Sequence, residues 1–466
     1  MITILFAAFL LFCMIVALVD WRRGWLLAIV CGVLQDPARK LTPGTPVLMS
    51  LSVVLVYLMV LFAAQGELKA HAREFARRFG GIYQAILLVF LFLILAALNG
   101  IATFGLENWK LPALSFFVYC IPFPAVILGY AYLQREEQLV GVLRFYSAVT
   151  ALALIGTPLE YFHVTSRLLG TVALESNLRL IPGYSIRLLS GIYRGPDIMG
   201  WHAATLACIG LLMAMHRRAI ARAWPWMLLA AWGFLNCLMS GRRKALYMVA
   251  VFALVLLWRY VRRLKVSDIV MFVLAGCVIG AVGYQVSSHE ESSVYTRGAE
   301  TSSNELFGRL EGGLAGSVEQ SGFMGAGLGS ATQGSQHVVV GKATLGWQEG
   351  GLGKLAVELG IPGVLAVMIL IAIMFRVLLK LTAHPDVAES SQLLRAGLFA
   401  LFMADAVTFL VSAQAYSDPL LALFTAFTLG CLFATASLDE RARIREEKGD
   451  PAIALRRISP AGVATT

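Results

Sequence analysis

The sequence predicts an all-α fold, a polytopic bundle of about 12 or 13 transmembrane helices, and three observations support that prediction. The 466 residues are 58% hydrophobic and only 14% charged, whereas an average soluble domain is roughly 25% charged. The mean hydropathy is +0.75. Apolar runs of about 20 residues, the length that crosses a bilayer, recur along the whole chain. This composition excludes a single water-soluble globule, a coiled coil, a collagen and a disordered chain.

The apolar runs divide into strong spans and one weaker span. The strong spans are 1–19, 46–65, 81–98, 112–133, 138–157, 198–215, 224–240, 244–261, 268–286, 350–377, 392–413 and 418–437. The weaker run, 24–35, is short enough to be a re-entrant piece, so the number of spans stays open by one. The first span has neither a basic leading segment nor a small-residue cleavage site, and we expect it to remain uncleaved.

Lys and Arg residues in short connecting segments predict the orientation of the bundle, because cytoplasmic loops carry an excess of both. The basic segments contain Lys69, Arg73, Arg77 and Arg78; His216, Arg217, Arg218 and Arg222; Arg259, Arg262, Arg263 and Lys265; and Arg441, Arg443, Arg445 and Lys448. An even number of spans separates these segments, so one topology places all of them in the cytoplasm. If 24–35 also spans, the N-terminus lies outside.

This topology divides the chain into blocks of membrane helices and two long outside loops. The blocks are N-terminal helices 1–157, a first periplasmic loop 158–197, central helices 198–286, a Gly-rich periplasmic loop 287–349, C-terminal helices 350–437 and a cytoplasmic tail 438–466. Neither loop has a sustained apolar pattern. We therefore expect both to fold back on the bundle as short helices and glycine turns.

Several kinds of chemistry are disfavoured by missing motifs. The seven cysteines lie inside apolar runs without a CxxC pair, so disulfides and thiolate metal sites are not expected. The chain has no DxD, HExxH, P-loop or GxSxG motif, which argues against metal-dependent sugar-nucleotide chemistry, metalloproteases, ATPases and α/β-hydrolases. The run GAGLGS, 325–330, lacks the strand that precedes a phosphate-binding loop. The net charge of +10 is attributed to loops facing anionic lipid, and no nucleic-acid partner is expected.

Cations on the outer side run against the positive-inside tendency. Arg242, Arg243 and Lys244 stand together at the outer end of a span, Arg194 precedes another span, and Arg309 lies in the second loop. One interpretation is that these side chains reach outer headgroups. The other is that they bind an anionic group at the membrane surface, such as a lipid diphosphate.

The stretch 322–367 resembles the C-terminal signature of the O-antigen ligase and polymerase superfamily. In that family an outside loop enters a Gly-x-Gly turn, and the following helix opens with an E-x-G-I-x-G pattern. Here the pattern reads from Glu358 through Gly360 to Gly363. These three residues are expected to have structural roles at the helix start.

Two further elements carry the same resemblance, which covers residues 190–365. The sequence SGRRKAL is similar to the family's T-G-S-R-G-A element and places its arginine at Arg243. Arg309 resembles an arginine that precedes the Gly-x-Gly turn. The ligase branch has a histidine nine residues before the helix glutamate, where this chain has Glu349. The chain is therefore more similar to the Wzy-like polymerases, some of which carry an acid there.

The resemblance implies a GT-C-like, metal-independent glycosyltransferase in the bacterial inner membrane, without a cofactor. It would polymerise exopolysaccharide or O-antigen repeat units carried on undecaprenyl diphosphate at the periplasmic face. A chain-length regulator and a flippase are the expected protein partners. The implied catalytic residues are Glu349, Arg309 and Arg243, and the implied substrate-binding residues are Arg242, Arg194, Lys342 and His337. His202 is a further, weaker candidate for a role in the site, and Tyr193 and Trp201 could stack on sugar rings.

Other roles stay open for these residues and for the chain. Glu349 could cap the helix that begins near 350, Arg309 could pair with Glu305 or Glu311, and Arg243 could anchor to headgroups. A ligase that transfers finished glycan to another acceptor is the alternative within the family. A polysaccharide or lipid transporter is the alternative outside it, and it would require charged residues along a path through the membrane.

Overall fold

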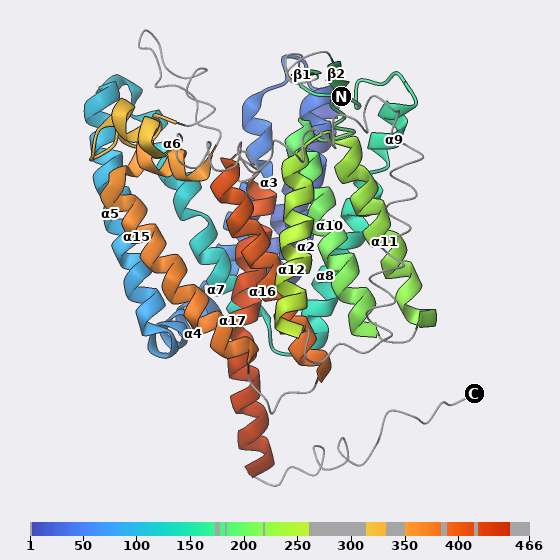
Figure 1. Ribbon diagram of the computed structural model, residues 1–466, viewed down its shortest axis with the longest axis vertical. Coiled ribbons are helices and arrows are strands. Elements are labelled where there is room, and N and C mark those ends of the chain that lie inside the picture. The colour runs from blue at the N-terminus through green and yellow to red at the C-terminus, as the bar shows by residue number, and fades with distance from the viewer. Residues whose placement is uncertain are drawn as a thin grey trace.

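The computed structural model describes residues 2–172, 178–181, 184–217, 220–260, 314–331, 350–383, 389–413 and 418–447. These residues form a bundle of long helices that run side by side along one direction (Figure 1). In the described part of the chain, eight helices are long and apolar enough to cross a membrane, or nine if one bent pair counts as a single span. The chain is a multi-pass helical membrane protein.

The helices follow the predicted order. They are α1 (Ile2–Val19), α2 (Trp21–Leu41), α3 (Ser52–Ala63), α4 (Gln65–Arg78), α5 (Gly80–Phe104), α6 (Lys110–Cys120), α7 (Pro122–Tyr132), α8 (Glu136–Ala153), α9 (Gly156–Tyr161), α10 (Pro196–Arg217), α11 (Ile220–Met239), α12 (Arg243–Tyr260), α15 (Gly351–Thr382), α16 (Glu389–Val411) and α17 (Pro419–Glu447). Short 3-10 helices cover Val47–Leu51 and Leu106–Asn108. Each predicted span falls on helical residues except 268–286, which lies outside the described residues, but 46–65, 112–133 and 138–157 are each divided between neighbouring helices. Within the described residues, the eight or nine helices that meet the length and hydropathy test are fewer than the 12 or 13 spans predicted.

The weak span 24–35 belongs to a complete helix. Helix α2 has 21 residues, about 31 Å at 1.5 Å per residue, so it is as long as a membrane-crossing helix. Asp20 caps its start by accepting hydrogen bonds from the backbone N–H groups of Arg22 and Arg23. The hydroxyls of Thr3 and Thr42 lie 3.2 Å apart, so α1 and α2 form an antiparallel hairpin. The apolar run looked short because charged residues occupy both ends of the helix.

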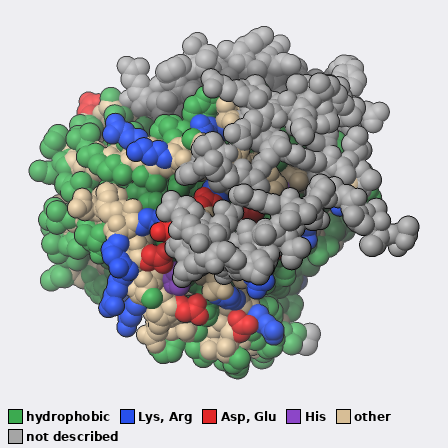
Figure 2. Space-filling model, turned by 90° about the horizontal axis from the view of Figure 1, so that it is seen from below, with side chains coloured by type: hydrophobic (Ala, Val, Ile, Leu, Met, Phe, Trp, Pro, Cys, Tyr) green, Lys and Arg blue, Asp and Glu red, His purple; other side chains and the backbone are tan. Residues whose placement is uncertain are grey.

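An ion pair and a hydrogen bond connect the predicted cytoplasmic segments to neighbouring helices at one end of the bundle, which we call the basic end. Arg78 of α4 donates to Glu440 of α17 at 2.9 Å, and Arg259 of α12 donates to Thr382 of α15 at 2.7 Å. Figure 2 looks onto this end, where Lys and Arg side chains lie among hydrophobic ones. At the opposite end, the loop end, lie the start of α1, the short helix α9 and the strands of residues 178–181 and 184–187 (Figure 1).

Helix α17 packs at the centre of the bundle against α7. A Cβ on Gly129 would lie 2.0 Å from the carbonyl oxygen of Phe427, and one on Gly430 would lie 2.0 Å from that of Val126. The two backbones approach this closely because each helix has a glycine at the crossing. The last turns of α17 extend beyond the other helices at the basic end (Figure 1).

A small β-hairpin departs from the predicted all-α fold. Strand β1 (Leu178–Ile181) pairs antiparallel with β2 (Tyr184–Arg187) inside the first long loop. The segments LRLI and YSIR alternate apolar with polar residues over only a few positions, and Pro-Gly separates them in the sequence. This pattern is typical of a hairpin, but it covers only two segments of four residues and so did not alter the prediction of a helical fold.

Candidate functional site

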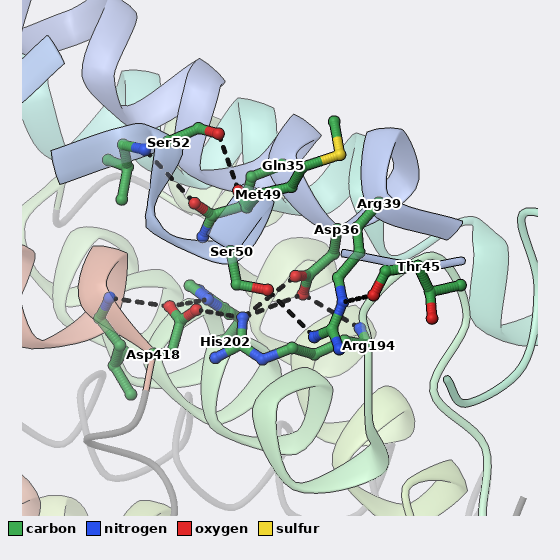
Figure 3. A network of polar contacts seen from close by, with 12 residues as sticks. Gln35, Asp36, Arg39, Thr45, Met49, Ser50, Ser52, Arg194, His202 and Asp418 are labelled. Atoms are coloured by element: carbon green, nitrogen blue, oxygen red, sulfur yellow. Dashed lines mark hydrogen bonds and ion pairs between the residues drawn. The ribbon is translucent and has the colours of Figure 1, made fainter. Parts of the chain in front are cut away.

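A buried polar cluster joins four parts of the chain near the loop end. It consists of Asp36 from α2, Arg194 from the segment before α10, His202 from α10 and Asp418 at the start of α17 (Figure 3). We call these four residues the polar cluster. The side chains of the two aspartates and of His202 are at most 2% exposed, and that of Arg194 is 13% exposed. Such groups are stable in the interior only when their charges and hydrogen bonds are matched.

Arg194 bridges the two carboxylates. Its Nη1 atom lies 3.0 Å from Oδ1 of Asp36 and 3.0 Å from Oδ1 of Asp418. Its backbone N–H also donates to Oδ2 of Asp36 at 3.0 Å. Both the backbone and the side chain of this residue are therefore fixed. The contacts connect α2 and α17 through one guanidinium group.

His202 extends the cluster into the bundle. Its Nε2 lies 3.2 Å from Oδ2 of Asp418, and its Nδ1 lies 2.8 Å from the hydroxyl of Tyr146. The ring of Tyr193 stacks on the imidazole, with centroids 5.0 Å apart. Asp418 also accepts a hydrogen bond from the backbone N–H of Leu421 and so caps α17. One aspartate thus fixes both the helix start and the position of its neighbours.

The electrostatics of Asp418 predict how stability depends on pH. Burial alone would raise the pKa of this carboxyl group, but the hydrogen bond to His202 and the charge of Arg194 outweigh it and lower the pKa from 3.8 to about 2. A lowered pKa in the folded state stabilises the protein above the unfolded pKa and stops doing so as the pH falls through the folded pKa. Wild type should therefore lose about 2 kcal/mol from this group between pH 4 and pH 2.

The measurement compares unfolding midpoints of wild type and Asp418→Asn across that pH interval. The other carboxyl groups titrate in both proteins, so the difference between the two curves isolates Asp418. The difference should be largest above pH 4 and should shrink toward pH 2. A constant difference would contradict the assigned ionisation.

Two further charged residues hold the first long loop in place beside the polar cluster. Lys40 donates to the carbonyl oxygens of Leu168 and Gly191 at 3.1 and 2.8 Å. Glu160 accepts hydrogen bonds from the backbone N–H groups of Ser190 and Gly191 at 3.0 and 2.7 Å. Lys40 therefore attaches the loop to α2, and Glu160 joins two parts of the loop. The loop was expected to fold back on the bundle, and these contacts agree with that expectation.

A second set of contacts surrounds the glycines of the second loop. Residues 322–331, which we call the glycine turn, lie between α5 and α15. The backbone N–H of Leu328 donates to the carbonyl of Ala96 at 2.9 Å, and that of Ala326 donates to the carbonyl of Val357 at 2.7 Å. These contacts fix the turn to two membrane helices.

Glu358 holds the glycine turn from the side of α15. The residue is completely buried. Its Oε1 accepts hydrogen bonds from the backbone N–H groups of Gly329 and Ala331, both at 3.3 Å, and its Oε2 accepts one from the hydroxyl of Tyr119 at 2.6 Å. Gly360 interrupts α15 with a φ of 69°, so that the N–H of the next residue reaches the carbonyl of Phe323. Glu358 and Gly360 thus have structural roles as expected, but they lie within α15 and not at its start.

The backbone N–H groups of the glycine turn are already engaged by acceptors within the protein. The backbone N–H groups of residues 325, 326, 328, 329, 330 and 331 all donate to protein oxygens. A phosphate-binding loop instead presents such groups to its ligand. The turn is therefore a packing element, in agreement with the missing strand.

The start of α12 lies beside the end of α16 at the loop end. Arg242 pairs with Asp197 at 3.0 Å, and Nζ of Lys244 lies 3.3 Å from the hydroxyl of Ser412. The start of α15 reaches the same turn of α16, because a Cβ on Gly350 would lie 3.4 Å from the carbonyl oxygen of Leu410. The first residues of α12 and α15 thus border one turn of α16.

The structure describes some of the predicted site residues and not others. Arg309, Glu349, Lys342 and His337 lie outside the described residues, and Arg243 is described only as the first residue of α12. Arg194 and Arg242 are both described, and both are paired with carboxylates. Their predicted contact with substrate stays a prediction.

Sequence reasoning missed the two aspartates of the polar cluster. Asp36 lies 158 residues from Arg194, and Asp418 lies 224 residues from it, so no local pattern joins them. One signal was available at each position. Asp418 precedes Pro419 at a helix start, a favoured cap, and Asp36 is the one acidic residue of its helix.

No protein-family model matches the chain, and no curated protein matches it either. The family resemblance therefore rests on the motifs quoted above, and the activity it implies is a proposal.

Proposed function

We propose that the protein is a metal-independent glycosyltransferase that polymerises lipid-linked glycan repeat units at the outer face of the bacterial inner membrane. The donor is a glycan on undecaprenyl diphosphate, and the acceptor is a sugar hydroxyl of a second lipid-linked glycan. The loop end is the face at which both substrates bind.

One observation supports this proposal more than any other: the beginnings of α12 and α15 border the same turn of α16. Arg243 is the first residue of α12, and Gly350 directly follows Glu349 in the sequence. Lys244 and Gly350 both approach residues 410–412. The start of α12, which carries Arg243, and the start of α15, which Glu349 precedes in the sequence, are therefore neighbours at the loop end, although the sequence separates them widely.

The proposed reaction is a single displacement at the anomeric carbon. The acceptor oxygen forms a new bond to that carbon while the bond to the diphosphate oxygen breaks, which inverts the configuration. Glu349 accepts the proton of the acceptor hydroxyl. Arg243 and Arg309 stabilise the negative charge that develops on the leaving diphosphate, because guanidinium groups bind phosphate oxygens in a fork-like geometry.

Within this proposal, the remaining predicted residues act around the reacting groups. Arg242, Lys342 and His337 bind the diphosphate or the glycan. The contacts of Arg194 favour a positioning role, since two carboxylates already neutralise its charge. The polar cluster would then fix the start of α10 and the loop next to it.

Single substitutions test the assignment. In cells that lack the wild-type gene, Arg243→Ala, Arg309→Ala and Glu349→Gln should each reduce polymer yield by about 100-fold or more, because each removes a group that stabilises the transition state. Lys110→Gln is the matched control, since Lys110 is exposed and has no role in the proposed reaction. Membrane abundance is measured for all variants by immunoblot.

The glycan that accumulates separates the alternatives. A failed polymerase leaves single repeat units on the lipid carrier, whereas a failed ligase leaves full-length polymer there. A failed transporter leaves repeat units on the cytoplasmic face. Unchanged yield in all three variants at normal abundance would show that the site is wrong.

A further inference from the structure

Helix α4 carries cations for which the proposed reaction has no use. The helix follows α3 after a single residue, Ala64, and is turned by 81° from it. It therefore lies across the bundle axis at the basic end (Figure 1). Amphipathic helices with this orientation at the end of a membrane bundle lie at the level of lipid headgroups.

The two acidic side chains of α4 contact groups of other helices, and that of Glu67 is also half exposed. Glu67 accepts a hydrogen bond from Nε1 of Trp21 at 3.3 Å, and Glu74 accepts one from the hydroxyl of Tyr130 at 3.0 Å. Phe75 is 1% exposed and marks the inward face of the helix. Both carboxylates of the helix are thus engaged by other helices.

The last basic residue of α4 also faces inward. Arg78 donates to Glu440 at 2.9 Å and to the carbonyl oxygen of Ala436 at 2.8 Å. This contact attaches α4 to α17. It leaves the other cations of the helix to a different surface.

Lys69, Arg73 and Arg77 form a row on the outward face. All three are exposed. Arg77 follows the buried Phe75 by two residues, which is a rotation of about 200° on a helix, and the spacing of four residues places all three cations on one stripe. Among the residues that the structure describes, no ion pair involves any of the three, and like charges at this spacing repel one another.

We propose that Lys69, Arg73 and Arg77 bind the headgroups of anionic phospholipids in the leaflet at the basic end. Both acids of the helix are engaged by groups of other helices, and in the described part of the chain neither forms an ion pair with the row, so the row keeps its positive charge. A helix lying in the headgroup region brings three cations to the level of the lipid phosphates, and basic side chains there bind anionic lipids. This inference does not depend on the proposed enzymatic activity.

The experiment measures lipid preference of the purified full-length protein. The protein is placed in nanodiscs of phosphatidylcholine, and spin-labelled phosphatidylglycerol is compared with spin-labelled phosphatidylcholine for the motionally restricted fraction. Wild type should prefer phosphatidylglycerol. The triple variant K69Q/R73Q/R77Q should lower that preference by about fivefold or more, because each cation near the surface contributes measurably to anionic-lipid binding.

A charge-retaining variant, K69R/R73K/R77K, is the matched control and should keep the preference of wild type. Lys110→Gln, which removes an exposed cation from a different helix, should also keep it. An unchanged preference in the glutamine variant would overturn the proposal. So would loss of the preference on addition of inorganic phosphate at constant ionic strength, because the row would then be a site for soluble anions. If the triple variant does not fold, Arg73→Gln alone should give a partial loss, and no loss would overturn the proposal.

Discussion

Replacement of Arg194 by alanine should destabilise the protein by about 3–5 kcal/mol, because the two buried carboxylates of Asp36 and Asp418 would lose the cation between them. Wild type holds Nη1 of Arg194 at 3.0 Å from each carboxylate. Without the guanidinium group, two negative charges would remain in the interior of the bundle. Equilibrium unfolding in detergent micelles, followed by circular dichroism, measures the change.

A second arginine provides the matched control. Arg242 also pairs with an aspartate at 3.0 Å, but both side chains of that pair are partly exposed, at 24% and 18%. Arg242→Ala should therefore cost about 1 kcal/mol or less. Equal losses in the two variants would contradict the importance assigned to the buried cluster.

Removal of the charges of Asp36, Arg194 and Asp418 together tests more strictly whether unpaired buried carboxylates cause the loss of stability. The variant Asp36→Asn/Arg194→Ala/Asp418→Asn keeps the alanine at 194 but removes the negative charges of both carboxylates. Replacement of a buried ion group by neutral residues is often tolerated. This variant should recover part of the stability that Arg194→Ala loses, whereas a purely steric role of Arg194 predicts no recovery.

Replacement of Gly327 by alanine should be the second large effect. Gly327 has a φ of 92°, and a Cβ there would lie 2.2 Å from the backbone nitrogen of Gly100. Neither backbone can move without breaking the hydrogen bonds that fix the glycine turn to α5. Strain at positive φ and overpacking together should cost about 2–6 kcal/mol.

Gly316 supplies the control for this substitution. It lies just before the glycine turn in the helical segment 314–321, and a Cβ added to it meets nothing within 4 Å. Gly316→Ala should leave stability unchanged or raise it by about 0.4–1 kcal/mol, since alanine restricts the unfolded chain more than glycine does. Both variants are compared by unfolding in the same detergent. If Gly327→Ala had the same unfolding free energy as wild type, the turn would not be tightly packed.

The membrane helices could be predicted from the sequence because their signal is local. An apolar run of about 20 residues needs no distant partner to be recognised. The common end of the basic segments also follows from a count of spans, and the pairing of Arg78 with Glu440 agrees with it. The structural role of Glu358 followed from its place in the helix-opening pattern.

The polar cluster could not be predicted for the opposite reason. Asp36, Arg194 and Asp418 come from three distant parts of the chain. Arg194 was recognised as an exception to the positive-inside tendency, and an anionic ligand was inferred for it. The structure supplies two anions from the protein itself. A charge that violates a local rule indicates that a partner exists, but the sequence around it does not say whether that partner is a ligand or a side chain.

The position of Asp418 has a consequence for biogenesis. Synthesis and membrane insertion proceed from the N-terminus, so Asp36 and Arg194 enter the membrane well before Asp418 leaves the ribosome. Until then, Arg194 has one carboxylate in place of two, and His202 lacks the acceptor that fixes its ring. Helix α17 therefore completes the fold when it arrives, and a nascent chain that stops before it exposes an unfinished polar surface to the insertion and quality-control machinery.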